Sequence, residues 1–221
     1  MRFVKPEGSS AQGAEVGGGA GASSEVWPSH KPAATAILDE VGIRRSLMRI
    51  AHEILERNEE PDRLYLVAIP NGGVPLARRL AANLREIADL VVPVGVLDTT
   101  LYRDDLLSTG ERPALRQTEM PSAVDDHVVV LVDDVVKTGR TIRAAMDALM
   151  DFGRPRVVQV VGLVDRGHRE LPIKLDYVGK NLPTHPDDEV QLRGLEGGLR
   201  GPLELVVLST EEASESRGAG K

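Results

Sequence analysis

Cysteine is missing from this sequence of 221 residues, and aromatic side chains are scarce. Without cysteine, the chain has no disulfide bond, no thiolate nucleophile and no zinc site with sulfur ligands. Aromatic residues account for 3% of the chain, so we expect a hydrophobic core of mainly aliphatic side chains. The five histidines are scattered and show no metal-ligand spacing. We therefore expect no metal site built from protein side chains.

Long apolar runs are also missing. No stretch approaches the roughly 20 apolar residues that span a bilayer, and the N-terminus lacks the apolar segment of a signal peptide. We expect a cytoplasmic protein with no membrane partner. The formal net charge is −7, which disfavours indiscriminate binding of nucleic acids but leaves room for RNA on a local basic face.

Low-complexity composition marks both ends of the chain. Residues 1–34 are rich in Gly, Ala and Ser without a hydrophobic period, so we predict a disordered tail there. We predict a second disordered tail over residues 210–221. Residues 35–209 then have the length of one domain with a proper core.

Five short apolar runs within residues 35–209 have the length and composition of buried strands. They are residues 64–69, 91–97, 128–132, 157–164 and 203–208. Amphipathic helices are predicted over residues 42–58 and 74–88, the first from a stripe formed by Ile43, Leu47, Ile50 and Ile54. This alternation predicts an α/β domain with a mainly parallel sheet and a ligand site at the carboxyl ends of its strands.

The central strand–loop–helix unit carries the strongest functional signal. Residues 128–132 end at two carboxylates, Asp133 and Asp134. We predict a short loop over residues 135–140, followed by a helix for which Thr141 is the N-cap. The N–H groups at a helix start point at one spot, where the helix dipole adds partial positive charge. Such a unit is typical of an anion site.

The residue types in this unit indicate which anion would bind. Gly139 allows backbone to come close to a phosphate, and the hydroxyls of Thr138 and Thr141 can donate to its oxygens. Asp133 and Asp134 only accept hydrogen bonds, so they require a ligand that also carries donors, such as the hydroxyls of a ribose. A ribose 5-phosphate unit satisfies both demands.

A second strand–loop–helix unit places Asn71, Gly72 and Gly73 in a turn whose N–H groups could meet a pyrophosphate. Residues 107–126 show no convincing period, and a segment of that length inside a domain is often a lid.

Basic side chains also share one face of the helix predicted over residues 42–58. They are Arg45, Arg49 and His52. This pattern fits a solvated basic face and a contact to RNA phosphates equally well.

Several segments together resemble the bifunctional pyrimidine operon regulators, which bind the leader RNA of pyrimidine genes and are also uracil phosphoribosyltransferases. The segments that carry the resemblance are RIAHEILERN at residues 49–58, TLYRDDL at 100–106, LVDDVVKTGRT at 131–141 and LVDRGHRELPIKLDYVGKNLPT at 163–184. The resemblance implies the type I phosphoribosyltransferase fold, with a mainly parallel central sheet flanked by helices and a flexible hood loop. It also implies formation of UMP from uracil and 5-phosphoribosyl-1-pyrophosphate (PRPP).

Roles for individual residues follow from the resemblance. The implied catalytic residues are Arg103, which would contact the pyrophosphate, and Asp133 and Asp134, which would hold the ribose hydroxyls. Substrate binding is further implied for Asn71, Gly72, Val135, Val136, Lys137, Thr138, Gly139, Arg140, Thr141, Arg166, Arg169 and Val190. RNA binding is implied for Arg49, His52, Arg169, Lys174, Lys180 and Thr184.

The resemblance also implies the partners of the protein. These are PRPP, uracil, UMP and UTP as small molecules, and the leader RNA of pyrimidine genes. Mg²⁺ is implied as a cofactor bound mainly through PRPP and water. A homo-oligomer, dimeric or larger, is expected.

Three positions depart from the family pattern. Asn71-Gly72-Gly73 stands where Thr-Arg-Gly is usual, Lys137 replaces an aromatic residue, and Met48 replaces a threonine of the RNA helix. The first two changes support an alternative in which a non-catalytic RNA-binding regulator uses a degenerate PRPP site as a nucleotide sensor.

Overall fold

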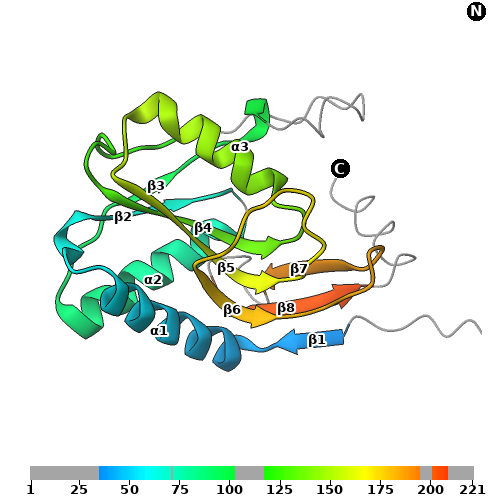
Figure 1. Cartoon of the computed structure of the whole chain (residues 1–221). Coiled ribbons are helices and arrows are strands. Elements are labelled where there is room, and N and C mark those ends of the chain that lie inside the picture. Colours follow the sequence, from blue (N-terminus) through cyan, green and yellow to red (C-terminus); the bar gives the residue numbers. More distant parts are fainter. Residues whose placement is uncertain (1–34, 71, 103–116, 195–200, 209–221) are drawn as a thin grey trace, which may run out of the picture. The chain divides into compact units, whose positions relative to one another are not determined.

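A parallel sheet of five strands forms the centre of the computed structural model, which describes residues 35–70, 72–102, 117–194 and 201–208. Its strand order is β3-β2-β4-β5-β6 (Figure 1). The strands are β2 Leu64–Ala68, β3 Val94–Val96, β4 Val128–Val136, β5 Val157–Asp165 and β6 Tyr177–Asn181. Every pairing in this sheet is parallel, which confirms the predicted α/β architecture.

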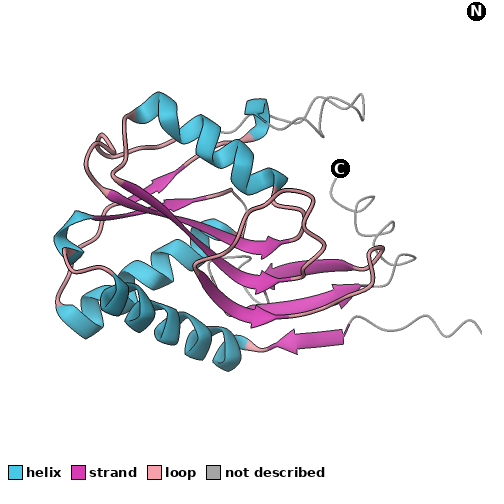
Figure 2. Cartoon of the chain, viewed as in Figure 1, coloured by secondary structure: helices cyan, strands magenta, loops and turns pink. Residues whose placement is uncertain are grey.

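Helices cover both faces of this sheet (Figures 1 and 2). Helices α1 (Glu40–Arg57) and α2 (Gly73–Ala88) pack against one face, and α3 (Arg140–Leu149) packs against the other. The unbroken apolar runs follow from this arrangement, because successive strand residues point to opposite faces and both faces are buried. In β4, for example, Val130 joins the core beneath α1 and α2, whereas Leu131 joins the core beneath α3.

A second, antiparallel sheet has the order β1-β8-β7. It contains β1 (Thr35–Leu38), β7 (Glu189–Gly194) and β8 (Leu203–Leu208). The bounds predicted for the last strand are confirmed, but that strand does not join the parallel sheet. Strands β1, β6 and β7 were not predicted, because they are short and only partly buried. Among the residues that the structure describes, the other regular elements are the 3₁₀ helices η1 (Pro61–Arg63), η2 (Thr100–Tyr102) and η4 (Met150–Phe152).

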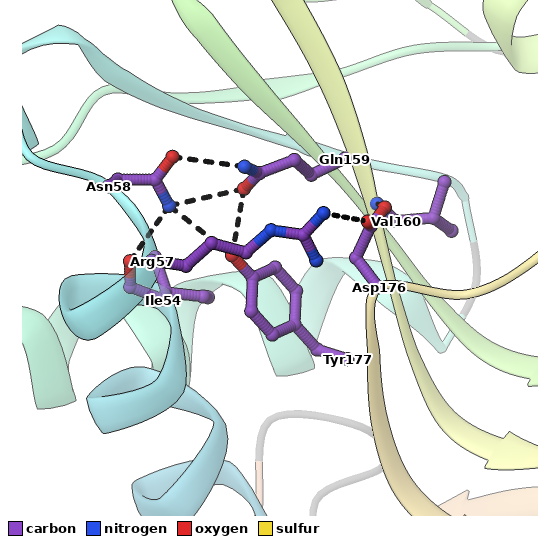
Figure 3. A network of polar contacts seen from close by, with 7 residues as sticks. All are labelled: Ile54, Arg57, Asn58, Gln159, Val160, Asp176 and Tyr177. Atoms are coloured by element: carbon purple, nitrogen blue, oxygen red, sulfur yellow. Dashed lines mark hydrogen bonds and ion pairs between the residues drawn. The ribbon is translucent and has the colours of Figure 1, made fainter.

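A buried polar network fastens the end of α1 to the sheet (Figure 3). The Asn58 amide donates to Ile54 O at 2.7 Å and to Gln159 Oε1 at 3.2 Å. Gln159 Nε2 donates back to Asn58 Oδ1 at 3.0 Å, and the Tyr177 hydroxyl donates to Gln159 Oε1 at 2.9 Å. Because these buried groups satisfy one another, they cost little desolvation energy and hold α1 against β5 and β6.

Candidate active site

Strand β4 is longer than the sequence pattern indicates. We predicted its end at Val132, but pairing with β5 continues from Asp133, opposite Gly162, to Val136, opposite Asp165. Carboxylates are poor strand formers on propensity, yet here the neighbouring strand extends equally far and supplies the pairing. The predicted loop over residues 135–140 is therefore shortened to residues 137–139, which we call the phosphate loop.

Helix α3 starts directly after the phosphate loop. Gly139, at φ 91°, occupies the position of the N-cap, and Thr141 lies within the first turn. The prediction that Thr141 caps the helix was wrong, because the left-handed conformation open to glycine makes the turn one position earlier than a threonine cap would. The positive end of the helix dipole consequently lies next to Gly139.

A cavity of about 240 Å³ opens at this point, at the carboxyl end of β4. Its lining residues are Asp133, Val135, Val136, Lys137, Thr138, Gly139, Thr141 and Ile142. The structure thus brings together most residues of the predicted ribose 5-phosphate site. The cavity combines a carboxylate, backbone of the phosphate loop and threonine hydroxyls, which is the combination that a sugar phosphate requires.

Asp134 is absent from that lining and is directed toward the turn before α2. A Cβ atom placed on Gly72 would lie 2.2 Å from Asp134 Oδ2 and 2.6 Å from Asp134 Cβ. A Cβ atom on Gly73 would lie 2.3 Å from the carbonyl oxygen of Val132. The glycine pair therefore lets α2 begin in direct contact with β4, and Asp134 fills the space that a side chain at position 72 would need.

The environment of Asp134 leads to a prediction on stability. Burial raises the pKa of Asp134 above its ordinary value, and the hydrogen bond with Asp133 opposes this shift. Between about pH 4 and pH 7 the unfolded chain releases the Asp134 proton more readily than the folded chain does. The free energy of unfolding therefore falls as the pH rises through this range. Asn carries no such proton. We expect Asp134→Asn to melt at a higher temperature than the wild type at pH 7 and at the same temperature at pH 4. Equal melting temperatures at both pH values would contradict the burial of this carboxyl.

The segment after β5 contacts both the phosphate loop and the connection from β6 to β7. Arg166 is 6% exposed, and its guanidinium donates to Thr184 Oγ1 at 2.9 Å and to Asp188 O at 2.7 Å. Burial lowers the pKa of Arg166. The substrate contact implied for Arg166 stays a prediction, and the structure shows its guanidinium bonded to this connection.

Other members of the predicted substrate set occupy distinct places. Lys137 Nζ donates to Pro186 O at 2.6 Å, so the lysine that replaces an aromatic residue points toward the same connection. Arg140 pairs with the exposed Glu170 at 2.7 Å. Val190 is buried in the core beneath α1 and α2 and does not line the cavity. Asn71, Arg103 and residues 107–116, the first half of the predicted lid, lie outside the described residues.

Three of the residues predicted to bind RNA, Arg49, His52 and Lys180, lie on α1 and β6 where these elements meet. Arg49 donates to Val178 O at 2.9 Å and to Gly179 O at 2.8 Å, which places it beside the strand that carries Lys180. His52 follows one turn later on α1 and is exposed, as is Lys174 before β6. Thr184 is held by Arg166. Arg169 differs from the others, because its guanidinium points at the phosphate loop, where it donates to Lys137 O at 2.6 Å.

The sequence analysis did not predict Asp165 and Glu170, which lie next to the phosphate loop. Asp165 Oδ2 pairs with Arg169 at 2.9 Å, and Glu170 N donates to Thr138 O at 3.0 Å. A signal for Asp165 was present, because it ends the buried strand beside β4 just as Asp133 follows the apolar run of β4. No pattern in the sequence indicates the contact of Glu170 with a loop some thirty residues earlier.

Comparison with known proteins finds a matching family model and several proteins of similar sequence. The family model described as "Phosphoribosyl transferase domain" matches residues 33–195. "Bifunctional protein PyrR" of Pelotomaculum thermopropionicum is 56% identical over 176 residues, which cover 80% of this chain and 96% of the relative. The protein of the same name from Deinococcus radiodurans is 54% identical over 73% of this chain and 88% of its own.

Solved structures resemble this chain in fold. A hypoxanthine phosphoribosyltransferase of Trypanosoma cruzi superimposes with a TM-score of 0.63 and 21% identity, covering 83% of this chain and 95% of the other. The corresponding enzyme of Staphylococcus aureus gives a TM-score of 0.59 and 20% identity, covering 80% and 94%. At these identities the likeness concerns the fold alone.

Proposed function

Because the chain belongs to the phosphoribosyltransferase family, and within it to the bifunctional PyrR proteins, we propose the following function for its site. It transfers ribose 5-phosphate from PRPP to uracil, which yields UMP and pyrophosphate, and the protein regulates pyrimidine genes through their leader RNA. The observation that carries this proposal is the cavity in which the Asp133 carboxylate faces the phosphate loop at the start of α3.

The geometry suits a reaction that depends on positioning. A ring nitrogen of uracil attacks C1 of the ribose, the bond to pyrophosphate breaks, and the nitrogen gives up its proton. The transition state carries positive charge on the ribose, so fixed groups that hold the sugar and the phosphate lower the barrier. In our proposal Asp133 accepts from the ribose hydroxyls, while the phosphate loop and the start of α3 bind the 5-phosphate.

Mg²⁺ would act through the substrate. Within the described ranges, no three His, Asp or Glu side chains come together as a metal site would require. The donors present therefore fit a cation that is held by the oxygens of PRPP and by water. When bound there, the cation would neutralise charge on the pyrophosphate, while the residues of this chain orient the ribose phosphate.

The direct test is UMP formation from uracil and PRPP with Mg²⁺, measured with the purified protein alongside UMP binding by calorimetry. We expect both turnover and binding. Binding without turnover would instead support the alternative, a regulator that senses nucleotides through a degenerate site. That alternative is favoured by one observation, since Gly72 replaces the usual arginine and Asp134 fills the space beside it.

RNA binding is tested at the surface where α1 meets β6. Lys180→Ala should weaken binding of a pyrimidine leader hairpin and lower the slope of log affinity against log salt by about one, as loss of one phosphate contact does. Arg49→Ala should act in the same direction but also releases two carbonyls of β6. Arg156→Ala is the matched control. Arg156 is an exposed arginine that immediately precedes β5 and pairs with Glu60. An effect of Arg156→Ala equal to that of Lys180→Ala would contradict the assignment.

The remaining partner proposals follow from membership of the family. We propose that the chain forms a homo-oligomer, which sedimentation analysis would test. Among the described residues no helix is long and apolar enough to cross a membrane.

A further inference from the structure

Three successive backbone carbonyls at the phosphate loop, those of Val136, Lys137 and Thr138, accept hydrogen bonds from residues 166–171. The oxygen of Val136 accepts from Arg166 N at 3.0 Å, and the oxygen of Thr138 accepts from Glu170 N at 3.0 Å. Between them, the oxygen of Lys137 accepts from the side chain of Arg169, at 2.6 Å. Residues 166–171 therefore determine the direction of each of these carbonyls, and the middle one depends on a guanidinium.

The direction of each carbonyl determines the direction of an N–H group. A trans peptide is planar, and its N–H points opposite to its C=O. Fixing the carbonyls of Val136, Lys137 and Thr138 on one side thus turns the N–H groups of Lys137, Thr138 and Gly139 to the other side. Those three residues line the cavity, so we infer that the contacts to the carbonyls aim the N–H donors of the loop at the ligand.

We propose that Arg169 is a positioning residue, which orients the phosphate loop so that the N–H of Thr138 meets the 5-phosphate of the nucleotide. This inference rests on the proposed function of the cavity and adds a role for a residue that does not line it. Arg169 is suited to the role because its position is itself fixed. Its Nε donates to Ile173 O at 3.0 Å, and its Nη2 pairs with Asp165 at 2.9 Å.

Charge considerations favour orientation over direct attraction. The Asp165 carboxylate bonds the guanidinium of Arg169 and offsets its positive charge at this distance. The side chain of Arg169 is also only 21% exposed, and the acceptors that surround it are Lys137 O, Gly167 O, Asp165 and Ile173 O. With its donors directed at these groups, Arg169 would have to leave the phosphate loop in order to contact RNA. These contacts direct Arg169 at the phosphate loop, and its contact with RNA stays a prediction.

The test compares UMP with uridine, which lacks the phosphate. In Arg169→Gln, a shorter amide replaces a guanidinium that reaches four acceptors. We therefore expect UMP affinity to fall about tenfold, or about 1.4 kcal/mol. Uridine affinity should stay within twofold. Arg169→Lys should recover part of the loss, since an ammonium can reach one acceptor but lacks the fork of a guanidinium. Asp165→Asn, which removes the charged partner of Arg169, should show a smaller loss of the same kind.

A matched control separates orientation from stability. Arg57→Ala removes an ion pair with Asp176 of 2.8 Å near the opposite end of β5, so it should lower the melting temperature without changing the ratio of UMP to uridine affinity. Equal losses for UMP and uridine in Arg169→Gln, or full UMP affinity in both Arg169 variants, would overturn the positioning role. Failure of the wild type to bind UMP would instead refute the proposed function.

Discussion

Replacing Asp133 with Asn is expected to weaken UMP and PRPP binding by about ten- to a hundredfold, which corresponds to the roughly 1.5–3 kcal/mol of a hydrogen bond to a charged group. Asp133 lines the cavity beside the phosphate loop, and in the proposed complex both of its oxygens can accept from ribose hydroxyls. An amide keeps one acceptor and presents N–H donors to hydroxyls, so at least one bond is lost. The fold should persist, because an amide oxygen can still accept from Asp134 N as the carboxylate does at 3.0 Å.

The cause of this loss can be isolated with 2′-deoxy-UMP, which lacks one hydroxyl. Calorimetry should show that the wild type prefers UMP and that Asp133→Asn reduces this preference, as a double-mutant cycle would for two groups in contact. Asp134→Asn provides the internal comparison, because the Asp134 side chain contacts Gly72 and does not line the cavity. We expect Asp134→Asn to change UMP affinity less than Asp133→Asn. The reverse order of effects would show that Asp134 is the residue that holds the ribose.

Gly72→Ala is expected to lower the free energy of unfolding by about 1–3 kcal/mol, as substitutions at other overpacked sites do. This loss should exceed that of the other single substitutions described above. The new Cβ atom would lie 2.6 Å from Asp134 Cβ, and rotation of the aspartate side chain cannot move that atom away. Backbone of the turn or of β4 must therefore shift. For a chain of this size each kcal/mol corresponds to about 2–4 °C in melting temperature. The same contact means that an arginine introduced at position 72 would displace Asp134 before it could reach a pyrophosphate.

Rescue by a second substitution tests this explanation. In the Gly72→Ala background, Asp134→Gly removes the opposing Cβ atom and should restore part of the stability, whereas Asp134→Ala keeps that atom and should restore less. Gly95→Ala is the matched control, because its Cβ would meet the flexible end of Met120 at 2.6 Å, and a thioether can move aside. Chemical unfolding of these four variants and of the wild type would measure these differences. A Gly95→Ala cost as large as that of Gly72→Ala would argue against a rigid contact.

Much of the architecture could be predicted because periodicity reports burial directly. The run at residues 128–132 is apolar throughout, and the run at 157–164 is apolar except for one polar side chain, Gln159, because helices cover both faces of the sheet. Ile43, Leu47, Ile50 and Ile54 are all buried as the helical stripe indicates. The site could be located for a related reason. Parallel strands bring their carboxyl ends to one edge, so a carboxylate and a glycine-containing loop after β4 had to lie together.

Other features depend on partners that are distant in the sequence, and the sequence pattern could not predict them. The extension of β4 through Asp133 and Asp134 requires β5 to extend equally far. The contact between Gly72 and Asp134 depends on how closely α2 approaches β4. Similarly, the role inferred for Arg169 arises from a hydrogen bond to a carbonyl 32 positions earlier, and carbonyl groups are identical at every residue.

The pairing of β1 with β8 bears on how this chain is made. Thr35 lies opposite Val207, so a ribosome that adds about 5–20 residues per second finishes the partner of β1 some 10–30 s after β1 itself. During that interval the N–H and C=O groups of β1 lack the strand that satisfies them, and such an edge is open to pairing with other chains. The parallel sheet can assemble earlier, because β6 ends at Asn181. A fragment that ends between residues 181 and 203 would thus contain every strand of the parallel sheet but leave β1 without its partner, so closure of the antiparallel sheet depends on the last strand of the domain to be synthesised.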